Sequence, residues 1–386
     1  MTWSWQQPDW PTFQWNRARL EAAEKQFLVG GGMFVGAVRH LRNEERDQLT
    51  IEAMGTEAVT TSEIEGEVLD RASVQSSIRK QLGLAADERR VRPAERGIAE
   101  MTVDLYRSFA EPLSEEMLFR WHRMVMSGRR DLKDVGRYRT GAEPMQVVSR
   151  AMYKPKVHFE APPSSRVPSE MARFITWFGR KGPGEKEALP ALTRAGIAHL
   201  YFECIHPFED GNGRIGRAIS EKALAQSLGQ PTLTALAATI LARRKNYYEV
   251  LEASNKQNEI TNWLMWFAGV AIEAQRRTIA MVEFLIDKTK LLDRLKGQLN
   301  ERQEKALLRI FREGPEGFRG GLTAGKYSTI TGASPATTTR DLADLVAKGA
   351  LVREGERRHA RYHLSVPLRP VPRITLSERG ELAETY

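Results

Sequence analysis

The sequence predicts an all-α protein that carries a small β-hairpin and a second, smaller module toward its C-terminal end. Apolar residues recur at helical spacing from Asn16 to about Gly128, and helical segments resume at Pro168. Between them, residues 129–168 are rich in the helix breakers Gly and Pro and hold two short extended runs. After residue 300, three short helical segments precede two more extended runs. These observations set the fold class.

Length, charge and cysteine content narrow the class of protein. The 386 residues are enough for two or three domains with a core. The 58 Lys and Arg against 49 Asp and Glu give a net charge of +9, which favours polyanionic partners. A soluble protein that is basic without binding a polyanion is the alternative, and charge alone does not exclude it. The single cysteine, Cys204, excludes an internal disulfide framework and a cysteine zinc site. We find no signal-like N-terminus and no membrane-length apolar stretch, so we expect a cytoplasmic protein without a membrane partner.

Residues 1–16 predict an extended arm. They hold four tryptophans, Trp3, Trp5, Trp10 and Trp15, among prolines. Large aromatic side chains are stabilised by packing, so we expect the arm to dock on the body of the protein. A platform for a ligand is the alternative.

Helices are expected through most of the remaining chain. Asn16 can cap a helix that begins at Arg17, and Gly30, Gly31 and Gly32 predict a break between two helices. The glycine run lacks the lysine and the spacing of a phosphate loop, so we expect no catalytic role for it. The other expected helices are 41–60, 73–82, 93–109, 114–127, 168–180, 193–203, 213–228, 232–254 and 260–299, the last as one long helix or two.

The extended runs predict two hairpins. Met145–Val148 and Lys156–Phe159 can pair within the Gly- and Pro-rich region. After residue 300 the order of elements is that of a winged helix-turn-helix. Its expected elements are helices at Arg302–Arg312, Leu322–Thr331 and Pro335–Lys348, then strands at Ala350–Arg353 and Arg361–Leu364 around a tip at 354–360.

Residues 206–217, His-Pro-Phe-Glu-Asp-Gly-Asn-Gly-Arg-Ile-Gly-Arg, carry the chemistry. The Gly-Asn-Gly turn directly precedes a helical run, so backbone N–H groups and the helix dipole favour an anion there. Arg214 and Arg217 share one helix face and can clamp phosphate oxygens. Asp210 is a hard oxygen ligand that suits Mg²⁺ on two phosphates, and His206 can act as a general base. Together they predict nucleotidyl or phosphoryl transfer.

Each of these residues also has a structural interpretation, with His206 as a buried turn histidine and Asp210 as a helix cap. Those interpretations leave the convergence of two arginines, a base and an acid unexplained.

The segment resembles the signature of the Fic family, H-x-F-x-[D/E]-G-N-G-R-x-x-R, with every fixed position matched. Similar proteins transfer AMP from ATP to a Ser, Thr or Tyr hydroxyl of a target protein. The resemblance implies an all-helical core with a β-hairpin flap.

The resemblance also implies a role for each matched position. His206 would deprotonate the target hydroxyl, Phe208 would anchor the loop in the core, and Asp210 would hold Mg²⁺. The implied phosphate-binding residues are Gly211, Asn212 and Gly213 as an anion hole, Arg214 for the β-phosphate and Arg217 for the γ-phosphate. The hairpin Met145–Phe159 would be the flap that aligns the target chain by strand pairing.

Two tyrosines downstream, Tyr247 and Tyr248, follow Asn246 in a stretch that resembles the region which helps to form the adenine pocket. A pair of tyrosines on a helix is also typical of core packing, and this alternative stays open.

A second match lies upstream. The sequence Thr-Ser-Glu-Ile-Glu-Gly at residues 61–66 resembles the Fic inhibitory motif, [S/T]-x-x-x-E-[G/N], which begins here at Thr61. Glu65 paired with Arg217 would occupy the guanidinium that the γ-phosphate needs, so the resemblance implies autoinhibition. A solvated acidic helix end is the structural alternative. Similar inhibited proteins can also remove AMP by using the inhibitory glutamate, and this reaction stays open for Glu65.

We therefore expect four parts. These are an aromatic arm and helical region carrying the inhibitory motif at 1–110, a Fic catalytic domain at 111–290, a winged helix-turn-helix at 300–365 and a tail at 366–386. The tail is rich in proline and then in charged residues, and we expect it to be loosely held.

The C-terminal module has two interpretations. The expected wing carries four arginines and the expected recognition helix opens with three threonines and an arginine, a pattern that suits contacts with DNA. Winged helices also mediate protein contacts, and a basic patch alone does not decide. The residues concerned are Arg353, Arg357, Arg358 and Arg361 in the wing, and Thr337, Thr338, Thr339 and Arg340 in the helix.

Two classes of function follow. The first is an ATP- and Mg²⁺-dependent protein adenylyltransferase, inhibited by Glu65, whose partners are ATP and a target protein with a hydroxyl side chain. The alternative is a DNA-binding regulator whose Fic domain senses nucleotide. Similar proteins also use other nucleotides or phosphocholine and commonly form homodimers, so the nucleotide, the oligomeric state and the target stay open.

Overall fold

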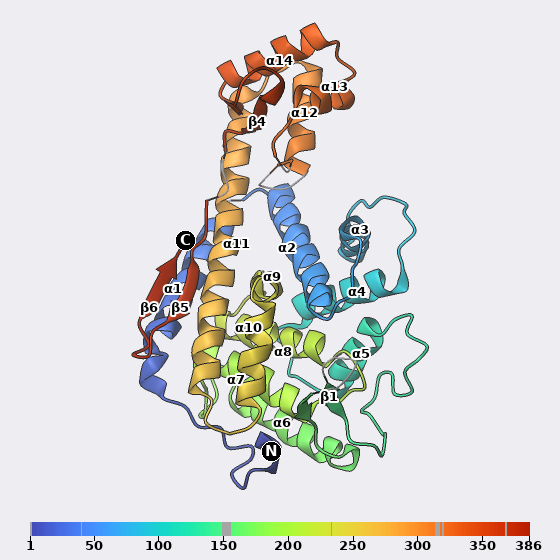
Figure 1. Ribbon diagram of the computed structural model, residues 1–386, viewed down its shortest axis with the longest axis vertical. Helices are drawn as coiled ribbons and strands as arrows, with labels where there is room; N and C mark the ends of the chain where they lie inside the picture. Colours follow the sequence, from blue (N-terminus) through green and yellow to red (C-terminus); the bar gives the residue numbers. More distant parts are fainter. Residues whose placement is uncertain are drawn as a thin grey trace. The chain divides into compact units, whose positions relative to one another are not determined.

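The computed structural model describes residues 2–39, 41–148, 156–232, 234–312, 317–318, 320–366 and 369–386, and helices dominate it (Figure 1). The chain divides into two compact units. The first comprises residues 1–35, 50–278 and 372–386, and the second comprises residues 36–49 and 279–371. The predicted mostly helical class is confirmed. None of the helices in the described ranges is both long enough and apolar enough to cross a membrane.

Eleven helices lie wholly or mainly in the described part of the first unit. They are α1 (Glu21–Arg39), α2 (Asn43–Ile64), α3 (Arg71–Gln81), α4 (Pro93–Ser108), α5 (Glu115–Val125), α6 (Val167–Arg180), α7 (Ala191–Ile205), α8 (Asn212–Leu228), α9 (Leu236–Leu241), α10 (Arg244–Ser254) and α11 (Thr261–Leu295). The region expected as one long helix or two is the single helix α11.

Local sequence explains several helix ends. The Asn16 side chain accepts a hydrogen bond from the Ala18 N–H at 3.1 Å and closes a short 3-10 turn before α1. The Ser114 hydroxyl accepts one from the Met117 N–H at 3.2 Å and begins α5. Gly229, with a φ of 67°, ends α8 in the left-handed conformation that glycine adopts at low cost.

The helix expected over 232–254 is instead two helices, α9 and α10. Helix α9 begins only at Leu236, where the Ala237 N–H donates to both carboxylate oxygens of Glu57, at 2.8 and 3.0 Å. The cap therefore comes from α2, about 180 residues away in the chain. A capping partner at this separation leaves no local signal in the sequence.

The break expected at Gly30–Gly32 is wrong, because α1 runs through all three glycines. Gly30 and Gly31 are buried against other helices. A Cβ at Gly30 would lie 2.0 Å from the Gln275 side chain, and one at Gly31 would lie 2.7 Å from the Leu228 side chain. These two glycines allow close packing of helices rather than ending one.

The centre of the first unit is the antiparallel pair α7 and α8. Every residue of α7 is buried, including the polar side chains Arg194 and His199. Phe174, Phe202 and Trp263 fill the core around this helix with no more than 1% of their surface exposed. The loop of residues 206–211 that joins α7 to α8 is consequently held at each end by a buried helix.

The predicted hairpin is confirmed for the residues that the structure describes. Strands β1 (Gln146–Val148) and β2 (Val157–Glu160) are antiparallel, with Val147 opposite Phe159. The residues that connect them, 149–155, lie outside the described ranges.

The N-terminal arm docks on the body, as expected. Trp3 and Phe13 are 6% and 8% exposed. The backbone of Gln14 pairs with the segment before α11, where its N–H donates to the Asn258 carbonyl at 2.7 Å. Packing of aromatic rings and backbone hydrogen bonds hold this arm together.

The loosely held tail expected at 366–386 is wrong for its last fifteen residues. Strands β5 (Arg373–Leu376) and β6 (Leu382–Thr385) form an antiparallel hairpin in the first unit. Ile374 is fully buried in the main core, and its N–H donates to the Glu273 carboxylate at 3.0 Å. Leu376 and Leu382 also pack against the main core, and Glu384 pairs with Arg276 at 2.6 Å, so apolar burial and an ion pair together hold this charged segment.

The second unit contains three helices followed by a hairpin. These are α12 (Glu301–Arg312), α13 (Ala324–Thr331) and α14 (Pro335–Ala347), then the antiparallel strands β3 (Leu351–Glu354) and β4 (Arg361–Leu364). Ser334 caps α14 through the Thr337 N–H. Leu307, Leu342 and Leu345 are fully buried and form the centre of this unit.

Candidate active site

A cavity of about 590 Å³ in the first unit gathers most of the residues that the sequence singled out. Its walls come from the end of α7, the 206–211 loop, the first turn of α8, the hairpin β1–β2, α10 and Glu65. The volume is in the range of small-molecule sites. Of the predicted site residues, the following line it: Glu65, His206, Asp210, Gly211, Asn212, Gly213, Tyr247 and Tyr248. Arg214 and Arg217 contact that lining from behind, through Asp210 and Glu65, and Thr61 in turn bonds Arg217.

The loop that carries the site is fixed from within and from outside. His206 ends α7 with a φ of 49°, a left-handed conformation that is uncommon for a residue with a side chain. The buried Arg139 donates from Nε to the His206 carbonyl at 2.8 Å and supports that conformation. Asn212 bonds both backbone groups of Phe208, accepting from its N–H at 3.0 Å and donating to its carbonyl at 2.8 Å.

The His206 imidazole is neutral near neutral pH. Burial, followed by the charge of Arg139, lowers the pKa of His206 to about 4, against a hydrogen bond to the Glu203 backbone that opposes the shift. A neutral imidazole carries a proton on one ring nitrogen and a free lone pair on the other. The Glu203 carboxyl lies 3.7 Å from His206 Nδ1, and burial raises the pKa of Glu203 to about 8. The histidine can therefore accept a proton beside a mostly protonated carboxyl.

A carboxylate occupies the anion position at the start of α8. Glu65 Oε1 lies 2.7 Å from an Arg217 terminal nitrogen, and a Cβ placed on Gly213 would be 2.3 Å from the same oxygen. Arg217, only 2% exposed, also donates to the Thr61 hydroxyl at 2.7 Å and to the Thr61 carbonyl at 2.9 Å. Glu65 thus sits over the helix N-terminus, where the backbone favours negative charge.

The second arginine of the motif is also paired. Arg214 contacts Glu67 at 2.8 Å and Asp210 at 3.4 Å. Asp210 in turn lies 2.6 Å from Arg129. Burial raises the pKa of Asp210, but the hydrogen bond from Arg129 and the charge of Arg214 outweigh it and leave the pKa below its ordinary value. Asp210 is therefore ionised at neutral pH.

These residues fit a magnesium ion that arrives with phosphates. Asp210 offers an ionised carboxylate to the cavity, and Mg²⁺ commonly takes one or two carboxylates together with substrate phosphates and water. In the described ranges there is no cluster of three or more acidic, histidine or cysteine side chains that could hold a metal unaided. Arg129 and Arg214 provide the positive charge beside Asp210 in this structure.

Tyr247 and Tyr248 differ in burial and in hydrogen-bond partner. Tyr247 is buried, and its hydroxyl is 2.8 Å from Nε2 of the buried His199. Tyr248 is 40% exposed and donates to the Ile64 carbonyl at 3.3 Å, next to the inhibitory segment. Asn246 accepts a hydrogen bond from the Trp266 indole at 2.5 Å. Both tyrosines line the cavity, so core packing and a ligand contact are compatible for Tyr247.

Sequence reasoning missed a histidine that supports the site. His122 stacks on Phe208 with ring centroids 4.1 Å apart. Its Nδ1 accepts from the Gly136 N–H at 2.8 Å, so Nε2 carries the proton and donates to the Asp210 carbonyl at 3.1 Å. His122 lies on α5, far from the motif in sequence, and only the fold connects them.

Three other side chains were also missed. Glu203 precedes His206 by three residues on the same helix, a spacing that could have been noticed. Arg129 and Arg139 lie in the irregular region after α5, where no periodic pattern marks a residue as important. Their roles depend on contacts that the sequence does not display.

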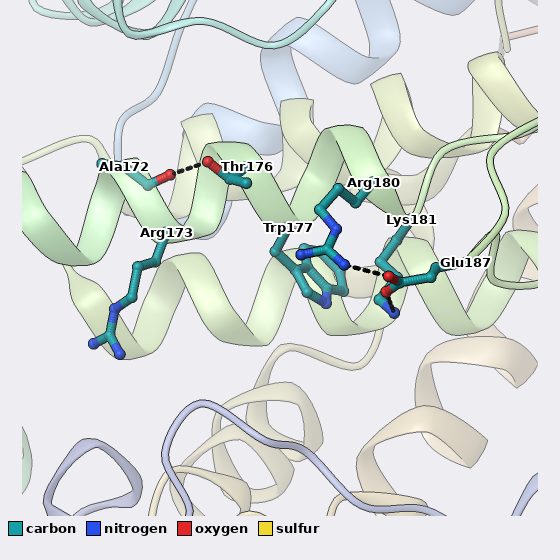
Figure 2. Close-up of a pocket in the computed structure, with 7 residues that line it drawn as sticks. All are labelled: Ala172, Arg173, Thr176, Trp177, Arg180, Lys181 and Glu187. Atoms are coloured by element: carbon teal, nitrogen blue, oxygen red, sulfur yellow. Dashed lines mark hydrogen bonds and ion pairs between the residues drawn. The ribbon is translucent and has the colours of Figure 1, made fainter.

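A second cavity, of about 420 Å³, lies along α6 and is lined by Trp177 and Arg173 among others (Figure 2). Its other cations, Arg180 and Lys181, both pair with Glu187 (Figure 2). None of the motif residues lines it, and its charged side chains are paired, Arg173 with Glu170 and the others with one another. We therefore assign the chemistry to the first cavity.

Comparison with known families agrees with this assignment. Residues 112–224 match the family described as Fic/DOC. The matched segment extends from α5 through the hairpin and α7 into α8. Residues 3–84, with the arm and α2, match a family described as a domain of unknown function (DUF4172).

Relatives are distant. The "Probable protein adenylyltransferase" of Aquifex aeolicus is 32% identical over 69 residues, which is 18% of this chain and about a fifth (20%) of that relative's length. A Fic family protein from Desulfovibrio desulfuricans is 21% identical with a TM-score of 0.50, over 89% of this chain and 95% of the other. A Fic domain containing signaling protein from Bacteroides thetaiotaomicron is 17% identical with a TM-score of 0.51, over 67% and 96%. At such identities the likeness to the solved structures establishes the fold alone.

Proposed function

We propose that the protein is a protein adenylyltransferase, which moves AMP from ATP to a Ser, Thr or Tyr hydroxyl of a target protein. The observation that carries the proposal is a neutral buried histidine facing the same cavity as the N-terminus of α8, with two buried arginines behind it. The Fic/DOC match and the name of the Aquifex aeolicus relative support the same class.

In this proposal, a residue of the chain can be assigned to each step of the reaction. The hydroxyl oxygen attacks the α-phosphorus and its proton moves to the free ring nitrogen of His206. The bond between the α-phosphorus and the bridging oxygen breaks, and pyrophosphate leaves. Backbone N–H groups at Gly211–Gly213 and the side chains of Arg214 and Arg217 hold the phosphate oxygens. When bound at Asp210, Mg²⁺ would neutralise charge on the phosphates.

Autoinhibition follows from the position of Glu65 in this proposal. A γ-phosphate that reached Arg217 would have to replace the Glu65 carboxylate at 2.7 Å, and Thr61 holds the same guanidinium in its present place. Both groups are anionic, so they cannot share one guanidinium and one helix N-terminus without repulsion. ATP would therefore bind with its terminal phosphate displaced, and transfer would be slow.

Labelled ATP tests this proposal. With Mg²⁺, label at the α-phosphate should appear on protein in Glu65→Gly and much less in the wild type, whereas label at the γ-phosphate should appear in neither. The additional change His206→Ala should abolish labelling, since loss of a general base costs roughly 10²–10⁴ in rate. Transfer of γ-label would replace nucleotidyl by phosphoryl transfer. Loss of AMP from a labelled protein on adding wild type would favour AMP removal as the reaction of the inhibited form.

The second unit supports a second candidate function, DNA binding by a winged helix-turn-helix. Arg340 on α14 and Arg353 and Arg357 on the hairpin are exposed. At the start of α14, Ala336 and Thr339 are also exposed and suit close approach to a groove, whereas Thr338 is buried and is not available for such a contact. Replacing Arg353 and Arg357 with Ala should weaken binding of a random-sequence duplex and reduce the salt slope by about one for each phosphate that an arginine had neutralised. If duplex binding changed neither with salt concentration nor with these substitutions, a protein partner would be favoured over DNA. The Arg358 side chain lies outside the described residues.

A further inference from the structure

The hairpin over the cavity has little core of its own. All three residues of β1 are exposed, and in β2 only Phe159 is buried. A two-stranded hairpin is marginally stable in water, so contacts from other segments must hold this one in place. Its position matters because Val147, His158 and Phe159 line the cavity, and the Phe159 ring lies 6.2 Å from the His206 ring.

The N-terminal arm supplies one such contact. The Trp3 ring packs edge-on against Phe159 with ring centroids 5.6 Å apart. Trp3, Phe159 and Ala161 form a small buried cluster that is separate from the main core. The Trp5 indole donates to the Glu160 carbonyl at 2.7 Å. The arm therefore gives β2 both an apolar cover and a backbone hydrogen bond.

The same turn of the arm is attached to two other walls of the cavity. The Ser4 N–H donates to the Asn255 carbonyl at 2.8 Å, and the Ser4 hydroxyl donates to the Cys204 sulfur at 3.3 Å. Asn255 follows α10 and Cys204 lies on α7, and both line the cavity. Residues 3–6 thus connect the hairpin to the fixed helices on the other sides of the site.

We propose that Trp3 and Trp5 are positioning residues that hold β2 against the cavity and keep Phe159 beside His206. This gives the matched domain of unknown function, residues 3–84, two tasks at one site. Its first residues hold the hairpin, and its helix α2 places Glu65 on Arg217. The effect on nucleotide rests on the proposed function, whereas the contact between arm and hairpin does not.

A second attachment of the hairpin is ionic. Lys156 and His158 both contact the Glu252 carboxylate of α10 at 2.6 Å. These groups are partly exposed, so salt screens them, whereas the aromatic packing of the arm has no net charge to be screened. Measurements at high salt therefore isolate the contribution of the arm.

Hydrogen exchange on the full chain tests the contact. The variants are Trp3→Leu and Trp5→Phe, and the matched control is Trp10→Phe, which also loses an indole hydrogen bond of the arm, to Glu170 on α6 at 3.0 Å. At high salt, exchange of the 157–160 amides should accelerate roughly tenfold in Trp3→Leu and about fivefold in Trp5→Phe, the factor for one typical hydrogen bond. The control should leave these amides unchanged. Unchanged protection in both variants, or equal acceleration in the control, would overturn the proposal.

Nucleotide binding tests the positioning role. In the Glu65→Gly background, the Kd of α,β-methylene ATP with Mg²⁺ should rise about three- to tenfold in both hairpin variants and stay constant in Trp10→Phe, as calorimetry would show. Faster exchange with an unchanged Kd would overturn the positioning role. If Glu65→Gly itself failed to bind the analogue, the proposed function would fail, and the exchange data would still decide the contact.

Discussion

Replacing Glu65 with Gln should improve nucleotide binding while it destabilises the empty protein. The change keeps the size of the side chain and removes its charge from Arg217, which is 2% exposed and lies 2.7 Å away. A hydrogen bond between charged groups contributes about 1.5–3 kcal/mol. Because the Glu65 side chain is 29% exposed, we take the contribution of the bond between Glu65 and Arg217 from the lower half of this range. Removing a competitor worth about 2 kcal/mol should lower the Kd for ATP roughly thirtyfold.

Calorimetry with α,β-methylene ATP and Mg²⁺ measures this Kd, and thermal unfolding without nucleotide measures the stability. The unfolding free energy should fall by about 1–2 kcal/mol, because Arg217 loses its counter-charge but keeps its bonds to Thr61. Glu63→Gln is the matched control, since Glu63 is exposed at the same end of α2 and its loss removes the same charge. A Kd within about twofold of wild type for Glu65→Gln, or an equal gain in the control, would refute the competition argument.

Three further outcomes follow from the structure. Gly30→Ala should lower the unfolding free energy by about 1–3 kcal/mol, because its Cβ would lie 2.0 Å from the Gln275 side chain. Gly32→Ala has open space around its Cβ and should be neutral or stabilising by up to about 1 kcal/mol. Equal effects of the two changes in urea titrations would contradict this. Gly213→Ala should abolish nucleotide binding even in the Glu65→Gly background, because its methyl group would enter the position that we propose for a phosphate. Nucleotide binding retained in calorimetry would show that the anion site is not at the start of α8. Burial lowers the pKa of His206 to about 4, so at this position the unfolded chain binds more protons than the fold between about pH 6.5 and 4. Relative to His206→Ala, the unfolding free energy of the wild type should therefore fall as the pH drops through this range, by up to about 2 kcal/mol at about pH 5, and equal pH profiles of the two proteins would contradict this.

Much of the site could be predicted from sequence because its parts are close together in the chain. The end of α7, a six-residue loop and the first two turns of α8 carry His206, Asp210 and both motif arginines. Turn residues, helix caps and periodicity are local properties, and they predicted the hairpin and most helices in the same way. Glu65 is the distant exception, and a short motif was enough to link it to Arg217.

The remaining features depend on contacts between distant residues. Gly30 sits inside a helix because Gln275 needs the space, and α9 begins where Glu57 caps it. Ile374 is buried in the main core and helps to anchor a charged tail, together with Leu376 and Leu382. Arg139, which supports the backbone of His206, comes from an irregular region without a pattern. Tertiary packing decides each of these cases, and one sequence does not show which of its distant residues will meet.

The most direct test of the central claim is a mass measurement on the intact protein and its products. After incubation with ATP and Mg²⁺, Glu65→Gly should gain the mass of AMP and release one pyrophosphate for each AMP bound. The double variant with His206→Ala should gain nothing, although it binds the nucleotide with a similar Kd. A gain of phosphate mass, or the same AMP adduct without His206, would contradict a nucleotidyl transfer in which this histidine accepts the proton.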